Sequence, residues 1–332
     1  MTRAVLMAGA LMVLGRIGAG GAPVTALAFS PDGRHLVSGG SRVVAWHSGD
    51  DGSERRRVRL EVPKIAGLAF HPEGRVVVAV GGTPGTEGVV QVLDGEDGRR
   101  MGSLVLGEEM AQGVAFAGDG GILGVAGGDG TVRFLRMSGE DGRLEAVATG
   151  HGHVGPVLGV ALAPAGATAV SVGADRSVKV WSVGEGRLLR TFTHHTDAVQ
   201  AVAFRPVSDG VEPAAGWVCA TGGSDRTVRV WQPAIGRMVR IVRHHEGAVL
   251  ALVYAPDGSA LYSAGEEGVV RRLDPDSDRI QARWEGEGEW IHALAMHPEG
   301  GRLASGDWAG RVRIWRVGTG GDGVMEEAAG GP

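Results

Sequence analysis

The chain has 332 residues, of which 33 are basic and 38 acidic, so its formal net charge is −5, and 43% of it is hydrophobic. This charge balance argues against a dedicated nucleic-acid-binding protein, which would carry a basic face or a high isoelectric point. The single cysteine, Cys219, excludes an internal disulfide and a cysteine-based metal site. Glycine is abundant, at 59 residues without a three-residue period, which predicts many tight turns and therefore many short strands.

The N-terminal segment allows two interpretations. Residues 4–14 form an apolar run behind Arg3, which resembles a short secretory signal but is too short to span a bilayer. Arg16 interrupts the region where cleavage would occur. The alternative interpretation makes this segment a β-strand, and the repeats described next decide between the two.

One phrase recurs along the chain. Residues 24–33 read VTALAFSPDG, an apolar strand that stops at a proline- and glycine-containing turn. Related phrases follow at intervals of 41 to 50 residues and begin at Ile65, Ala111, Val157, Val199, Val249 and Ile291. Seven copies predict a repeat architecture in which each unit packs only on its neighbours.

Each copy is predicted to contain four strands. In the fourth copy the first strand begins at Val157, the second covers 168–172, the third 177–181 and the fourth 187–192. A turn of small residues at 173–175 separates the second strand from the third. No segment shows helical periodicity over ten or more residues. The chain is therefore predicted to be all-β, with short antiparallel strands.

The fourth and fifth copies share a set of polar residues: a histidine before the first strand, Ser or Thr in the second, Asp in the next turn and Trp at the end of the third. These residues are His153, Ser171, Asp175 and Trp181 in the fourth copy, and His195, Thr221, Asp225 and Trp231 in the fifth. On this pattern, residues 11–317 resemble the WD-repeat (WD40) β-propeller family. The resemblance implies a seven-bladed β-propeller with four antiparallel strands per blade, and a buried hydrogen-bonded chain formed by these four side chains. A buried carboxylate in such a chain needs imidazole, hydroxyl and indole donors.

The other copies depart from the pattern. The sixth keeps His245 and Ser263 but has Glu267 and Leu273, and the seventh keeps Ser305 and Trp315 but has Ala309 in place of Asp. The first has Trp46 and a shortened turn without Asp, and the second and third end their third strands in Leu93 and Leu135. Blades four and five are therefore predicted to be the most rigid.

Closure of the ring decides between the two interpretations of the N-terminus. The last copy lacks a good fourth strand after Trp315, while Val13, Leu14 and Ile17 have the spacing of an outer strand relative to Val24. We therefore expect the N-terminal strand to close the ring and to remove an exposed sheet edge. The predicted organisation is a lead-in over 1–10, one propeller domain over 11–317 and a Gly/Glu-rich flexible tail over 318–332. This interpretation makes the protein cytoplasmic, whereas a cleaved signal would make it exported.

Several motif-like stretches have simpler explanations. Residues 150–155 match G-x-G-x-x-G but precede a strand instead of opening a helix, which argues against nucleotide binding. Asp274, Asp276 and Asp278 echo a calcium loop, but Arg279 stands where the glycine belongs. Three pairs contain histidines at repeat-equivalent positions, which favours a structural role over a metal site: His151/His153, His194/His195 and His244/His245. Cys219, in a strand, is interpreted as a buried apolar residue. We expect no metal, no cofactor and no catalytic residues.

A partner is expected on the top face of the propeller, where the first residues of the first strands and the turns between second and third strands surround the channel. The positions facing this side include Lys64, Met110, Gln112, Leu158, Gln200, Leu250 and Glu266, and in blade seven Trp290, His292 and Trp308. Tryptophan is enriched in binding hot spots. Arg176 and Arg226 could add a basic edge, and Trp217 could serve a second partner on the opposite face.

The resemblance implies a non-catalytic scaffold that binds a partner protein or peptide. We expect a monomeric propeller within a larger complex, without nucleic acid and without insertion into a membrane. Nearly all basic residues are arginines, a bias typical of a GC-rich bacterial genome. The alternatives are an exported propeller that binds a peptide or glycan, and a propeller enzyme, for which the sequence offers no convergent polar groups.

Overall fold

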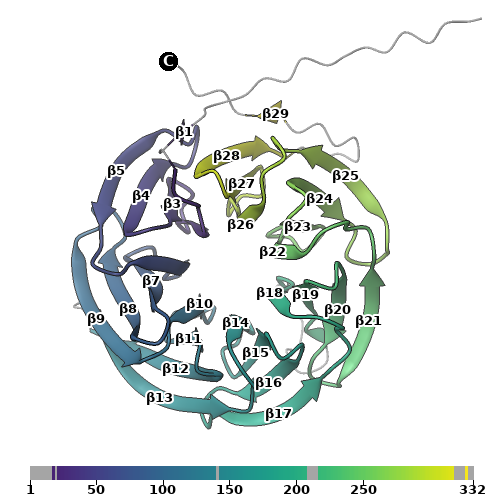
Figure 1. Ribbon diagram of the computed structural model, residues 1–332, viewed down its shortest axis with the longest axis horizontal. Helices are drawn as coiled ribbons and strands as arrows, with labels where there is room; N and C mark the ends of the chain where they lie inside the picture. Colours follow the sequence, from purple (N-terminus) through teal and green to yellow (C-terminus); the bar gives the residue numbers. More distant parts are fainter. Residues whose placement is uncertain (1–16, 19–20, 140–141, 208–215, 318–325, 328–332) are drawn as a thin grey trace, which may run out of the picture.

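The computed structural model describes residues 17–18, 21–139, 142–207, 216–317 and 326–327. Seven antiparallel sheets are arranged around a central channel, with the first strand of each sheet nearest the axis and the fourth at the rim (Figure 1). We number these sheets as blades one to seven in chain order. The predicted all-β, seven-bladed propeller is confirmed.

Blades one to three occupy the N-terminal part of the ring. Blade one contains β2 (Ala26–Phe29), β3 (His35–Gly39), β4 (Val43–Ser48) and β5 (Glu54–Arg59). Blade two contains β6 (Lys64–Phe70), β7 (Val76–Thr83), β8 (Glu87–Asp94) and β9 (Arg100–Gly107). Blade three contains β10 (Ala111–Phe116), β11 (Ile122–Gly127), β12 (Thr131–Ser138) and β13 (Arg143–His151).

Blades four to six complete most of the remaining ring. Blade four contains β14 (Val157–Leu162), β15 (Thr168–Gly173), β16 (Val178–Ser182) and β17 (Arg187–Phe192). Blade five contains β18 (Val199–Phe204), β19 (Cys219–Gly223), β20 (Val228–Gln232) and β21 (Arg237–Val242). Blade six contains β22 (Val249–Tyr254), β23 (Leu261–Gly265), β24 (Val269–Leu273) and β25 (Ile280–Glu285).

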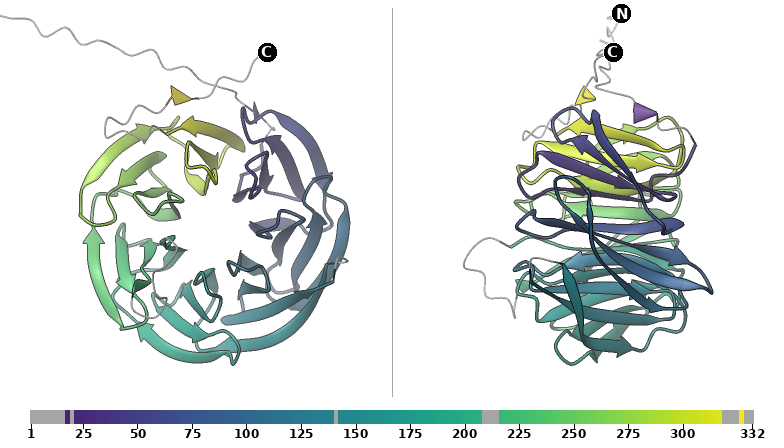
Figure 2. Two further views of the ribbon diagram at one scale, coloured as in Figure 1. Left: turned by 180° about the vertical axis from the view of Figure 1, so that it is seen from behind. Right: turned by 90° about the vertical axis from the view of Figure 1, so that its left-hand side faces the viewer.

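Blade seven is closed from both ends of the chain. It contains β26 (Ile291–Met296), β27 (Arg302–Asp307) and β28 (Arg311–Arg316), and β1 (Ile17–Gly18) pairs antiparallel with one half of β28. The N-terminal strand thus closes the ring, as predicted, although Val13 and Leu14 lie outside the described residues. A second short strand, β29 (Glu326–Glu327), pairs with the other half of β28. Figure 2 shows both short strands, purple and yellow, on the same side of the ring. The domain boundaries remain a prediction.

Blade seven also packs directly on blade one. A core of buried side chains joins them, with Leu27 and Leu36 from blade one and Ala304 and Ile314 from blade seven among its members. Arg302 of blade seven also donates from Nη1 to the carboxylate of Asp50, in the turn after β4 of blade one, at 2.5 Å. These contacts hold the ring shut where the chain begins and ends.

The recurring Pro-Asp/Glu-Gly turn also tightens the contact between neighbouring blades. Gly33 has a φ of +71°, a conformation that glycine adopts without strain. A Cβ at this position would overlap the imidazole of His297, which belongs to the corresponding turn of blade seven. The same imidazole packs edge-on against Phe29, with ring centroids 5.2 Å apart. Glycine is therefore required at this turn both by the backbone conformation and by the neighbouring blade.

Blade one differs from the sequence-based alignment by one residue. The strand register pairs His47 with Leu36, as it pairs Trp181 with Ala169 in blade four, so His47 and not Trp46 stands where the repeat tryptophan belongs. Trp46 therefore faces the opposite side of the sheet, where its Nε1 donates to the Gly95 carbonyl of blade two at 2.9 Å. The cause is the shortened turn before β4, because a shift of one residue moves a side chain to the other face of a strand.

Candidate functional site

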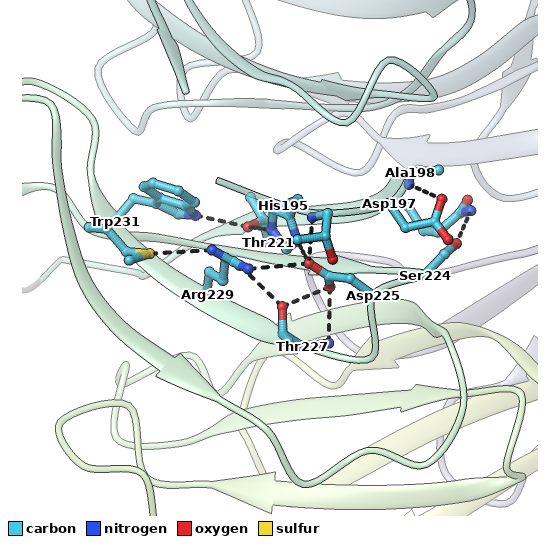
Figure 3. A network of polar contacts seen from close by, with 12 residues as sticks. His195, Asp197, Ala198, Thr221, Ser224, Asp225, Thr227, Arg229 and Trp231 are labelled. Atoms are coloured by element: carbon cyan, nitrogen blue, oxygen red, sulfur yellow. Dashed lines mark hydrogen bonds and ion pairs between the residues drawn. The ribbon is translucent and has the colours of Figure 1, made fainter. Parts of the chain in front are cut away.

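Blades four and five each contain a four-residue hydrogen-bond chain. In blade four, Trp181 Nε1 donates to Ser171 Oγ at 2.7 Å, and Ser171 Oγ lies 2.7 Å from His153 Nε2. His153 Nδ1 lies 3.0 Å from both carboxylate oxygens of Asp175. Blade five repeats this chain (Figure 3). Thr221 Oγ1 lies 2.8 Å from Trp231 Nε1 and 2.8 Å from His195 Nε2, and His195 Nδ1 lies 2.9 Å from the Asp225 carboxylate.

The donors available in this chain determine which imidazole nitrogen carries the proton. The indole can only donate, so the serine oxygen accepts from Trp181 and gives its own proton to His153 Nε2. The Nδ1 of His153 then donates to the carboxylate of Asp175. Every polar atom of the chain is thereby satisfied with a neutral imidazole, and burial accordingly lowers the pKa of His153. Ser171 and His153 are buried, and the Trp181 indole occupies a lone pair of the serine oxygen, so a substrate cannot reach this Ser-His-Asp arrangement and its role is structural.

The carboxylate at the end of each chain is strongly stabilised as an anion. Burial alone would raise the pKa of Asp175, but hydrogen bonds from the Ser177 hydroxyl, the Val154 amide and His153 lower it to about 2. The pKa of Asp225 is likewise held well below its usual range by His195 and Thr227, against the effect of burial. In blade five Arg229 also reaches the carboxylate, at 3.3 Å.

Blade six builds a variant of the chain without tryptophan. His245 Nε2 lies 2.8 Å from Ser263 Oγ, and its Nδ1 lies 2.6 Å from the Glu267 carboxylate. Arg271 adds an ion pair to Glu267, with Nη2 2.8 Å from Oε2. The longer side chain of Glu267 thus occupies the aspartate position, and the guanidinium of Arg271 balances the charge of its carboxylate.

Blade seven carries a network that the sequence analysis missed. Glu287 stands four residues before Ile291, where His153 stands before Val157, and it contacts Arg311 and Arg313. Arg311 also donates to the Asp307 carboxylate at 2.9 Å, while Trp315 Nε1 still donates to Ser305 at 2.9 Å. A glutamate at the histidine position followed by two arginines on β28 is the signal that could have identified this ion-pair network.

The top face owes its geometry to one backbone hydrogen bond that recurs around the ring. In each case the residue just before the acidic residue of the turn donates its amide to the carbonyl of the residue before the first strand. The distances are 2.9 Å for Ala174 to Pro156, 2.8 Å for Ser224 to Ala198 and 3.1 Å for Glu266 to Ala248. In blade seven this bond joins Trp308 to Trp290, at 2.8 Å. The backbone therefore brings together two side chains that are 18 positions apart in the sequence.

Three aromatic side chains form a cluster at this point. The ring centroids are 6.0 Å apart for Trp290 and Trp308, 6.2 Å for Trp290 and His292, and 5.2 Å for His292 and Trp308. Trp290 is 45% exposed and Trp308 is 51% exposed. Burial and the charge of Lys64 lower the pKa of His292, and its Nε2 is buried with no hydrogen-bond partner among the described residues.

The other predicted top-face residues are distributed around the channel. Six of them line a cavity of about 380 Å³ along the axis: Lys64, Gln112, Leu158, Gln200, Leu250 and His292. Gln200 is held by Ser224, at 2.9 Å, and Glu266 accepts a bond from the Ala248 amide at 3.1 Å. Met110 is only 2% exposed, so the expectation that its side chain faces a partner is wrong. Its carbonyl instead receives the recurring backbone bond, from Gly128.

Two further expectations concern residues outside the cluster. Arg176 and Arg226 are exposed next to the turn aspartates, and both adopt positive φ angles, 66° and 62°. Their guanidinium groups are thus available at the top rim. Trp217, expected on the opposite face for a second partner, is buried and packs edge-on against Phe204, so it offers no binding surface.

The motif-like stretches also have defined places. Asp276 pairs with Arg205, with Nη1 2.7 Å and Nη2 2.9 Å from its carboxylate oxygens, and Asp274 accepts bonds within its own turn. In the described part of the chain, no group of three or more His, Cys, Asp or Glu side chains is placed to hold a metal ion. Cys219 is fully buried, and burial raises the pKa of its thiol to about 12.

The comparison with known families agrees with this geometry. The WD domain, G-beta repeat (WD40) family matches residues 14–52, 144–182, 186–232, 236–272 and 279–316, which together are more than half of the chain. The protein belongs to the WD40 repeat family.

A curated relative is also found, an uncharacterized WD repeat-containing protein of Synechocystis sp.. It is 36% identical over 95 residues, or 28% of this chain, and the match spans about a quarter (26%) of the relative's length. Its cyanobacterial source fits the bacterial origin expected from the arginine bias. No helix among the described residues has the length and apolar character needed to cross a membrane.

Proposed function

We propose that the protein is a non-catalytic scaffold that captures a partner protein or peptide on the top face of the propeller, with Trp290, His292 and Trp308 as the central contact. The family to which the chain belongs typically serves protein interaction. The observation that carries the proposal is the exposed aromatic cluster at the channel mouth.

The chemistry of the cluster suits a binding hot spot. Tryptophan buries a large area at low cost in conformational entropy, and the rings are already packed on one another before a partner arrives. The Nε2 of His292 is buried without a hydrogen-bond partner among the described residues, so the accessible surface of the cluster is that of the two indole rings. An apolar side chain of the partner would pack on these two rings.

The test is affinity capture from the native host with the wild type and with the double variant Trp290→Ala/Trp308→Ala, followed by mass spectrometry. A partner retained by the wild type should be lost by the variant. Because about half of each indole is exposed, the melting temperature should change little.

A matched control removes apolar surface elsewhere. Val105 on β9 and Ile235 in the turn after β20 are exposed at the rim, so Val105→Ala/Ile235→Ala should retain the partner. Equal capture by wild type and the tryptophan variant would place the partner site elsewhere. A large fall in the melting temperature of the tryptophan variant would assign the cluster to packing instead.

A further inference from the structure

A cleft lies between blade seven and blade one, away from the channel. It has a volume of about 340 Å³ and is lined by the segments 22–24 and 38–43, by Gly310 and Val312 of blade seven, and by side chains of β4 and β5. Its volume is in the range of small-molecule sites.

The cleft exists because blade one lacks the polar chain that fills this place in blades four and five. Ala45 of blade one pairs with Ser38, and Lys179 of blade four pairs with Ser171 at the equivalent position. The short side chain of alanine therefore stands where blade four has a lysine. His47 replaces the repeat tryptophan, and its Nε2 lies 2.8 Å from Ser38 Oγ. The Nδ1 of His47 is buried without a hydrogen-bond partner among the described residues. The wall of the cleft therefore contains a buried polar pair instead of a packed indole.

The mouth of the cleft is positively charged. Arg42, Arg57 and Arg59 line it, against one carboxylate, Glu54. Glu54 is engaged by Arg57 in a two-bond pair, at 3.0 and 2.7 Å. The guanidinium groups of Arg42 and Arg59 make no hydrogen bond or ion pair with the described residues, and both side chains are exposed. The cleft thus has an excess of two positive charges, both carried by groups that are free to bind.

We propose that this cleft binds a phosphate group of a small molecule, with Arg42 and Arg59 as its charge partners and the Ser38–His47 pair as the polar wall behind them. Guanidinium groups match phosphate oxygens geometrically. A phosphate near neutral pH carries up to two negative charges, which balances the excess at the mouth, whereas a single carboxylate would leave one positive charge uncompensated. This site is distinct from the aromatic cluster on the top face.

Isothermal titration calorimetry of the full chain with inorganic phosphate and, separately, with O-phosphoserine tests the proposal, with chloride added to keep the ionic strength constant. The wild type should bind at least one of them saturably, with one site per chain. The double variant Arg42→Asn/Arg59→Gln should weaken this binding by about tenfold or more. Asparagine is chosen because Arg42 has a φ of +57°, which asparagine tolerates.

Two further variants keep the result interpretable. Arg55→Gln, on the same exposed strand but not in the cleft, removes one positive charge, as each half of the double variant does, and should leave the affinity within about twofold. Ala45→Met fills the cleft without changing charge and should abolish binding. Tighter binding of O-phosphoserine would indicate a phosphorylated organic ligand, and tighter binding of inorganic phosphate a free anion. No saturable binding of either probe, or an equal loss in Arg55→Gln, would overturn the proposal, whatever the outcome of the partner capture.

Discussion

At the residue scale, the fold depends on carboxylates that are buried only because their partners are complete. Asp175 accepts bonds from an imidazole, a hydroxyl and a backbone amide, and Asp225 does the same with a guanidinium in addition. Each bond favours the charged carboxylate over its neutral acid. Folding therefore lowers the pKa of these groups, and this couples stability to pH.

Asp175→Asn should expose this coupling. The folded-state pKa of Asp175 is about 2, below its unfolded value near 3.8, so its stabilising contribution is fully present above about pH 4 to 5 and is lost as the pH falls toward 2. Urea unfolding at pH 7 should show a loss of roughly 2–3 kcal/mol in the variant, from the size of this shift. The difference from wild type should shrink as the pH is lowered from 5 to 3. The exposed Asp278→Asn serves as the control, and a difference that stays constant with pH would contradict the assignment.

At the element scale, blade one shows where sequence spacing fails. The seven copies and their four strands were predictable because the Pro-Asp/Glu-Gly turn and the alternation of apolar residues depend on local backbone geometry. The residue at the repeat-tryptophan position of blade one was not predictable. The turn before β4 is one residue shorter than in blade four, and matching residue types along the sequence does not detect the resulting shift in strand register. As a result, His47 lies on the sheet face where Trp46 was expected, and Trp46 lies on the opposite face.

Replacement of Trp46 tests its reassigned role. Trp46 is 1% exposed, packs among residues of blades one and two, and its only polar atom donates to the Gly95 carbonyl. Trp46→Ala should destabilise the protein by about 3–5 kcal/mol through the cavity it leaves. Trp46→Phe keeps most of the packing but leaves the Gly95 carbonyl unpaired, so it should cost about 1–3 kcal/mol. Equal losses in chemical denaturation would mean that the hydrogen bond, and not packing, holds blades one and two together.

At the scale of the whole molecule, the closed ring brings together residues that are distant in the sequence. The aromatic cluster was predictable because the position before each first strand and the position in the next turn are neighbours in every blade, through the recurring backbone bond. The ion pairs of Glu287 and the cleft beside Arg42 were not predictable, because each depends on residues that differ from the repeat pattern. A repeat pattern predicts what blades share, and the structure is needed where they differ.

These differences should give the ring uneven rigidity. Blades four and five hold complete polar chains, blade six holds a chain without tryptophan, and blade one holds only the Ser38–His47 pair beside an open cleft. Local opening costs less free energy where fewer buried contacts are broken. Hydrogen exchange measured by mass spectrometry should therefore be slowest in β15 and β19, faster in β23 and fastest in β3, among second strands that all lie in the same layer. Ser171→Ala should speed exchange in β15 toward that of β23 while leaving β3 unchanged, because blade one is not adjacent to blade four and each blade packs only on its neighbours. Uniform exchange across the four strands would mean that ring closure, and not the polar chain of each blade, limits opening.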